Sequence, residues 1–264
     1  MKKRVFKGWV LVVALAVAGC TTAPITGRKQ VKLVSDAAMI AQSASSYREV
    51  IAEGPLSTNR QQTEQVRRVG QRIAAAVETY FRDHNQSDLV SGFEWEFNLI
   101  DQDIPNAWCM PGGKVAFYTG ILPFTQDEAG IAVVMGHEIA HAVAGHGAER
   151  VSHEMIQQGG GYIVSMFSKN SDYHDAIMQV YGLGSELGGI LPYSRLHESE
   201  ADRLGLIFMA MAGYDPNASI GFWSRMAAAG NGAPPEFLST HPSDETRIRE
   251  LKKHMPEAMD YYRP

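Results

Sequence analysis

Cysteine is scarce in this sequence, and clusters of positive charge are almost absent from it. Its 264 residues include 2 cysteines, which excludes a scaffold held together by several disulfides. The formal net charge is −5 and no stretch rich in lysine and arginine follows the first few residues, so a nucleic-acid partner is not expected. Hydrophobic residues make up 45% of the chain and charged residues 20%, which is typical of a globular protein and excludes a disordered chain.

The N-terminus has the pattern of a secretion signal. Residues 1–7 are mostly basic or apolar, and residues 8–19 carry no charge but are too few to span a bilayer as a helix. This pattern predicts a signal peptide over residues 1–19. The stretch ends in Val17-Ala18-Gly19-Cys20, which resembles the lipobox of bacterial lipoproteins, where the cysteine becomes the lipidated first residue. We therefore expect a membrane anchor at Cys20.

The residues after Cys20 lead to further expectations about location and organisation. By resemblance to sorting in Gram-negative lipoproteins, Thr21 in place of Asp favours the outer membrane, so we expect a periplasmic lipoprotein. Residues 20–35 are expected to form a tether, and residues 36–264 a single domain. Cys109 is the other thiol, and its apolar neighbours indicate a packing role.

Hydrophobic periodicity predicts a fold made mainly of helices. Five stretches have helical periodicity or helix-start signals: 36–53, 61–82, 125–144, 193–212 and 243 to about 254. The third begins with a capping-box pattern, Thr125 to Glu128. Alternating residues predict a strand at 93–99, and segments 106–110 and 114–119 flank a Pro-Gly-Gly turn, which indicates a hairpin. The expected fold class is α+β, mainly α-helical, with a small sheet or hairpin beside the 125–144 helix.

The strongest chemical signal lies within the predicted 125–144 helix. His137 and His141 are four residues apart, so both imidazoles lie on one face of the helix and can bind one metal ion. Glu138 lies about 100° around the helix from His137, too far to be a third ligand but within reach of a metal-bound water. The pattern His-Glu-x-x-His is typical of zinc hydrolases, so we expect one Zn²⁺ per chain with Glu138 as the general base.

A catalytic zinc site needs a third protein ligand, and the spacing leaves two candidates. The metzincin arrangement requires glycine at 144 and histidine at 147, whereas this sequence has Ala144 and Gly147. Residues 155–185 contain no glutamate, which excludes a thermolysin-like ligand. The remaining candidates are Glu186 and the run from His197 to Asp202.

The run from His197 to Asp202 has an informative geometry. Glu198 and Asp202 are four residues apart on one helix face, bordered by the small residues Ala201 and Gly205, which would let two helices approach closely. Glu198 could then reach the metal, and Asp202 could accept a hydrogen bond from the outer nitrogen of a ligand histidine. Glu200 lies nearer the apolar stripe, although helical phase alone does not exclude it as the ligand.

Four sequence blocks occur in a recognisable order: Asn106-Ala107 with Pro111-Gly112-Gly113, Gly136 to His141, Tyr193-Ser194-Arg195 with Glu198 to Asp202, and Ser239 to Pro242 with Arg247. These blocks resemble the HtpX-like, Oma-like and type I CAAX prenyl protease family of zinc metalloendopeptidases, metallopeptidase family forty-eight, and the resemblance extends over about residues 60–255. The resemblance is greatest to its periplasmic lipoprotein and quality-control branch. It implies a gluzincin-like zinc metalloprotease domain on a lipid anchor, with Glu198 as the zinc ligand.

His241 is a further candidate for the site. It precedes Pro242, which favours an extended backbone, and it lies far in sequence from the zinc-binding helix. Two roles are open: His241 could donate a hydrogen bond to the oxyanion during cleavage, or it could occupy the open zinc position in a resting state. Both roles require the imidazole to lie close to the metal.

The expected function is zinc-dependent cleavage of unfolded or misassembled envelope proteins, a form of protein quality control. Substrates are expected to be proteins or peptides that add to an edge strand of the 106–119 hairpin, and envelope assembly machinery is a candidate partner. The alternative is a periplasmic chaperone or scaffold lipoprotein that holds clients in a groove with little cleavage. The intact Glu138 argues against this alternative, because binding alone needs no base.

Overall fold

The computed structural model describes residues 20–157, 177–178, 180–181, 194–229, 237, 241 and 245–264. The predicted signal peptide, the ligand candidate Glu186 and the predicted helix start at Ser243 lie outside these residues. Within the described ranges, none of the helices is both long enough and apolar enough to span a membrane.

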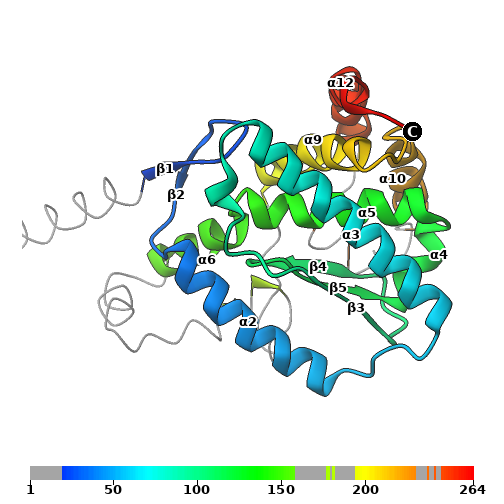
Figure 1. Ribbon diagram of the computed structural model, residues 1–264, viewed down its shortest axis with the longest axis horizontal. Coiled ribbons are helices and arrows are strands. Elements are labelled where there is room, and N and C mark those ends of the chain that lie inside the picture. Colours follow the sequence, from blue (N-terminus) through cyan, green and yellow to red (C-terminus); the bar gives the residue numbers. More distant parts are fainter. Residues whose placement is uncertain are drawn as a thin grey trace, which may run out of the picture.

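A three-stranded sheet has the order β3-β5-β4 (Figure 1). β4 (Ala107–Met110) and β5 (Lys114–Tyr118) form the predicted antiparallel hairpin, with Cys109 opposite Val115. β3 (Glu96–Ile100) pairs with β5 in parallel. It begins three residues later than the alternating pattern indicated, because the strand starts only where pairing with β5 starts.

The two faces of the sheet pack against different helices (Figure 1). Ala107 and Cys109 face the larger core with α3 (Arg60–Asp83), whereas Trp108 and Met110 face a second core with α2 (Asp36–Glu53). This division follows from the alternation of side chains along a strand. Burial raises the pKa of the Cys109 thiol, which is consistent with a packing role.

Two helices at the centre of the fold approach each other at a pair of glycines. α5 (Glu128–Val143) carries His137 and His141, and α9 (Arg195–Met211) carries Glu198. A Cβ on Gly136 would lie 2.8 Å from the backbone oxygen of Gly205, and a Cβ on Gly205 would lie 2.9 Å from the backbone nitrogen of His137. Any larger residue at either position would push the helices apart.

The ends of α5 agree only partly with the sequence analysis. The N-cap is Asp127, whose side chain accepts a hydrogen bond from the backbone of Gly130, whereas the capping-box pattern predicted Thr125. Thr125 instead ends the short α4 (Leu122–Thr125). The helix ends before Gly145, which has a positive φ of 72° as expected of a C-terminal glycine.

The other helical elements are α6 (His146–Gln157), α10 (Ala218–Ala229), α12 (Glu245–Tyr261) and the 3₁₀ turns at Ser87–Leu89 and Thr119–Ile121. Neither α6 nor α10 was expected from the sequence. α12 continues past His254 to Tyr261 and contains Pro256. The predicted α+β, mainly helical fold class is confirmed by the arrangement of these helices around the small sheet.

Residues 20–35 differ from the tether that we expected. β1 (Cys20–Thr22) and β2 (Lys29–Val31) form an antiparallel hairpin. Gln30 is buried, with 3% of its surface exposed, and its side-chain amide donates to the backbone oxygen of Ala144 at 2.9 Å. Residues of this segment from Ala23 onward are therefore held on the domain, by burial of Ala23 and by polar contacts of Gln30 and Leu33 with the end of α5 and with α6.

Candidate metal centre

Four buried side chains converge between α5 and α9. His137, His141, Glu198 and His241 each offer one ligand atom, and these atoms all lie within 4.8 Å of one another. The Nε2 atoms of His137 and His141 are 3.0 Å apart, as expected for histidines one helical turn apart that face one point. The structure therefore brings together the three predicted ligands and His241.

Glu198 and His241 complete this cluster from other parts of the chain. The Oε1 atom of Glu198 lies 3.2 Å from Nε2 of His141 and 3.1 Å from Nδ1 of His241. Nδ1 of His241 is also 3.1 Å from Nε2 of His137. Three imidazole nitrogens and one carboxylate are a donor set that suits Zn²⁺, so the residues present fit a zinc ion.

Glu138 lies beside the cluster, in a water-poor position. Its exposed fraction is 2%, and its Oε1 atom has no hydrogen-bond partner among the described residues. Nε2 of His241 lies 3.4 Å from this oxygen. Burial raises the pKa of Glu138, which brings the carboxylate closer to the range useful for a general base.

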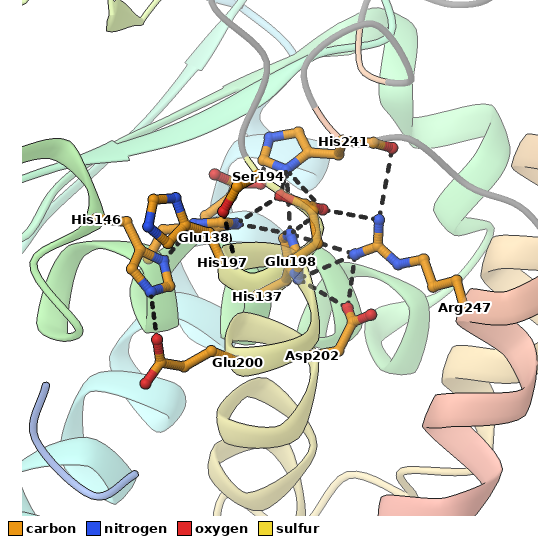
Figure 2. A network of polar contacts seen from close by, with 11 residues as sticks. His137, Glu138, His146, Ser194, His197, Glu198, Glu200, Asp202, His241 and Arg247 are labelled. Atoms are coloured by element: carbon orange, nitrogen blue, oxygen red, sulfur yellow. Dashed lines mark hydrogen bonds and ion pairs between the residues drawn. The ribbon is translucent and has the colours of Figure 1, made fainter. Parts of the chain in front are cut away.

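Asp202 takes the outer position that its spacing predicted (Figure 2). Its Oδ1 atom lies 3.0 Å from Nδ1 of His137 and accepts a hydrogen bond from Arg247 at 2.6 Å. Arg247 also donates to Oε2 of Glu198 at 2.9 Å, and its guanidinium lies 3.3 Å from the centroid of the Trp223 ring. Burial alone would raise the pKa of Glu198, but the charges of His241 and Arg247 hold it well below its usual range.

Arg247 entered the sequence analysis only as part of a resemblance, and its role was not predicted. No local spacing connects it with Glu198, because it lies on α12 and meets α9 only through the tertiary fold. The two helices do pack against each other, with Arg203 of α9 paired to Glu257 of α12 at 2.7 Å. The sequence signal for Arg247 was therefore limited to its position after the Ser239 to Pro242 block.

A second network of hydrogen bonds begins at Nδ1 of His141, the ring nitrogen that points away from the ligand cluster. This nitrogen is 2.8 Å from Nδ1 of His146, and Nε2 of His146 is 3.0 Å from Oε2 of Glu200 (Figure 2). The side chain of His146 is fully buried. Burial lowers the pKa of His146 to about 4, so this imidazole is neutral at physiological pH.

Glu200 and His197 are thereby placed outside the ligand cluster. Glu200 points toward His146, and Nε2 of His197 lies 2.9 Å from Oε2 of Glu149. Of the residues the structure describes, the group able to hold a metal contains Glu198 and neither of these two.

Comparisons with known proteins agree with this arrangement. Residues 60–255 match the model of Peptidase family M48. The chain is 36% identical to the mitochondrial metalloendopeptidase OMA1 of Schizosaccharomyces pombe over 89% of this chain and 66% of that protein. It is 33% identical to the mitochondrial metalloendopeptidase OMA1 of Homo sapiens, over 64% of this chain and 34% of that protein. It is also 26% identical to the beta-barrel assembly-enhancing protease of Yersinia pestis, over 78% of this chain and 41% of that protein.

These relatives correct one prediction. The OMA1 relatives are named as mitochondrial proteins, so the expected periplasmic location in the outer membrane is wrong. That expectation depended on a short local pattern in residues 1–21, whereas the similarity to these relatives extends over most of the chain.

The chain spans 66% of the fission yeast relative and 34% of the human relative, so these proteins contain further sequence that has no counterpart here. The similarity nevertheless covers the segment that carries α5, α9 and Arg247. Since the family model matches most of the chain and the site has the donors of a metallopeptidase, the chain belongs to peptidase family M48, a family of metal-dependent peptidases.

Proposed function

We propose that this chain is a zinc-dependent endopeptidase, with His137, His141 and Glu198 as zinc ligands and Glu138 as the general base. The observation that carries the proposal is the convergence of the ligand atoms within 4.8 Å beside the buried carboxylate of Glu138, whose Oε1 atom has no hydrogen-bond partner among the described residues. Bound at this position, zinc would lower the pKa of a water molecule and polarise the scissile carbonyl. One zinc ion per chain is expected.

The residues of the chain then have separate tasks. Glu138 accepts a proton from the attacking water and returns it to the nitrogen of the leaving amine, so the carboxylate is regenerated at the end of the cycle. Asp202 orients His137, because a hydrogen bond to Nδ1 leaves Nε2 free to bind metal. Arg247 holds the carboxylates of Glu198 and Asp202 in place.

We propose that the substrates are unfolded or misassembled proteins. In the described part of the chain, β4 has a strand partner on one side only, which is β5. An extended peptide can therefore add to β4 by main-chain pairing, which a folded client cannot do. The Yersinia relative is named a beta-barrel assembly-enhancing protease, and this name supports an assembly machinery as a partner of this chain.

A comparison of one protein in two states tests the proposed substrate class. We expect the purified full chain to cleave a reduced, alkylated protein at least about tenfold faster than the same protein in its folded form, because only the unfolded chain can pair with an edge strand. Equal rates on the two forms would contradict the proposed substrate class. Binding of the unfolded form without cleavage would support the chaperone alternative.

His241 provides a prediction about the resting state. Its Nδ1 atom lies within the ligand cluster, 3.1 Å from Nε2 of His137, so it can fill the position that a catalytic zinc ion keeps open for water. We therefore expect His241→Ala to raise basal proteolysis several-fold while zinc content stays at one ion per chain. The matched control is His254→Ala, on an outer helix. A rate lowered on the order of a hundredfold would assign His241 the oxyanion-donor role instead.

We also propose that Cys20 carries a lipid that attaches the chain to a membrane. The support for this proposal is the sequence Val17-Ala18-Gly19-Cys20 at the end of the apolar segment. We expect Cys20→Ser to move the protein from the membrane fraction to the soluble fraction, and Thr21→Ser to have no effect. An unmodified Cys20 in the mass spectrum of the membrane-extracted protein would contradict the proposal.

A further inference from the structure

The hairpin formed by β1 and β2 brings an arginine to the back of the metal centre. The guanidinium of Arg28 donates from Nε to Oε2 of Glu200 at 2.7 Å. Its two terminal nitrogens donate to both carboxylate oxygens of Glu149, at 3.0 Å and 2.7 Å. The exposed fractions of the Glu149 and Glu200 side chains are 6% and 4%, so Arg28 joins two buried carboxylates.

Hydrogen bonds connect Arg28 with His141 through Glu200 and His146. If Nε2 of His141 binds the metal, its proton must be on Nδ1, which then donates to Nδ1 of His146 at 2.8 Å. The proton of His146 is consequently on Nε2, which donates to Oε2 of Glu200 at 3.0 Å. Oε2 of Glu200 thus accepts hydrogen bonds from both His146 and Arg28, and the guanidinium holds this carboxylate oxygen toward His146.

Arg28 has a counterpart on the other ligand histidine. Arg247 binds Asp202 at 2.6 Å, and Asp202 lies 3.0 Å from Nδ1 of His137. Each histidine of α5 is thus connected to a carboxylate that an arginine binds. His137 contacts Asp202 directly, whereas His141 reaches Glu200 through His146. One arginine comes from the C-terminal helix and the other from the N-terminal hairpin.

We propose that Arg28 is a positioning residue for the metal centre, which acts through Glu200 and His146 on the orientation and tautomer of His141. This proposal rests on the proposed zinc site. Residues 20–34 lie outside the segment matched by the family model. The proposal therefore adds a residue from outside that segment to those that position the zinc ligands.

The hairpin is fastened at other points, which fixes the place of Arg28. Gln30 donates to the backbone oxygen of Ala144 at the end of α5, and the backbone nitrogen of Leu33 donates to the hydroxyl of Ser152 at 2.8 Å. Thr26, in the turn before Arg28, donates its hydroxyl proton to Oε1 of Glu200. Without the guanidinium, the buried carboxylates of Glu149 and Glu200 would lose their shared positive partner, and Glu200 would be a less stable acceptor for His146.

The test uses the full chain, and zinc itself is the probe. We expect Arg28→Gln to weaken zinc binding between about tenfold and a hundredfold in a competition assay with a chelating dye, the range found when an outer partner of a ligand histidine is removed. Lys32→Gln is the matched control, because Lys32 lies on the same segment but pairs with exposed Asp36 at 2.6 Å. We expect this control to bind zinc as the wild type does.

Two further measurements separate positioning from a general loss of stability. The rise in Tm on adding zinc should be smaller in Arg28→Gln than in the wild type. If Arg28 had a purely structural role, its replacement would lower the Tm of the zinc-free and the zinc-bound protein alike and leave the rise unchanged. In the double variant with Glu200→Gln, zinc binding should be no weaker than in Glu200→Gln alone, because Arg28 acts through Glu200.

The outcomes also distinguish this proposal from the proposed function. An unchanged zinc affinity in Arg28→Gln, an unchanged Tm rise, or independent losses in the double variant would overturn the role of Arg28 while leaving the zinc site intact. A wild type that does not bind zinc would overturn the proposed function, and the role of Arg28 with it.

Discussion

Replacing Glu138 by Gln is expected to lower the rate of peptide cleavage by about a thousandfold or more, while zinc content and fold are unchanged. Glu138 is the carboxylate beside the cluster with a raised pKa and an oxygen that lacks a described hydrogen-bond partner. Glutamine has nearly the same shape but cannot accept the proton of the attacking water, so it removes the base and little else. General base catalysis contributes about 10²–10⁴ in rate, and Glu138 also returns the proton to the leaving amine.

The matched control for this variant is Glu128→Gln. Glu128 lies at the start of the same helix, where it pairs with Arg68 and is partly exposed. Its removal is expected to change stability slightly and the rate of cleavage hardly at all, because an exposed ion pair contributes little. Cleavage by Glu138→Gln at a rate near that of the wild type would end the mechanism proposed for this site.

Replacing Glu198 by Ala is expected to reduce zinc affinity by more than about a hundredfold, beyond the usual effect of losing an outer partner. Both of its oxygens face the cluster: Oε1 is 3.2 Å from Nε2 of His141 and Oε2 is 3.5 Å from Nε2 of His137. The variant should therefore emerge from dialysis without metal, as measured by elemental analysis.

The control for Glu198 lies two residues away on the same helix. Glu200→Ala removes a carboxylate of the same size, but Glu200 faces His146 and not the ligand cluster. This variant should bind one zinc ion at saturating zinc, with the weaker affinity expected for an outer residue. If Glu200→Ala loses the metal and Glu198→Ala retains it, Glu198 is not the third ligand.

The local parts of the site could be predicted from sequence because helical geometry determines them. The spacing of His137 and His141 and that of Glu198 and Asp202 each place two side chains on one face of a helix. The small residue at Gly205 indicated a close helix approach, and its partner, Gly136, is visible only once the two helices are packed.

The distant parts of the site could not be predicted in the same way. His146 follows the helix-ending Gly145, and its contacts with Glu200 and His197 of α9 arise only from the tertiary fold. Arg28 lies 121 residues from Glu149 and 172 residues from Glu200, so no periodicity connects them. The parallel pairing of β3 with β5 has the same origin, since it joins strands that are not neighbours in a hairpin.

Two further differences between the expected and the observed fold, at residues 20–35 and at the start of α5, arise where the local sequence pattern is weak. Residues 20–35 contain polar and turn-forming residues and were expected to be a tether, yet Gln30 and Ala23 are buried against the domain. Thr125 and Asp127 are both residue types that cap helices, so residue type alone does not decide between them. The backbone of Gln126 has a positive φ of 68°, which separates α4 from α5 and leaves Asp127 as the N-cap of α5.

The most direct test of the account is proteolysis of an unfolded protein by the purified full chain, before and after removal of metal. We predict that a chelator abolishes cleavage, that one equivalent of Zn²⁺ per chain restores it, and that Zn²⁺ restores no cleavage to Glu138→Gln. Cleavage that continues undiminished in the metal-free wild type would contradict the assignment of His137, His141 and Glu198 as the ligands of a catalytic zinc ion.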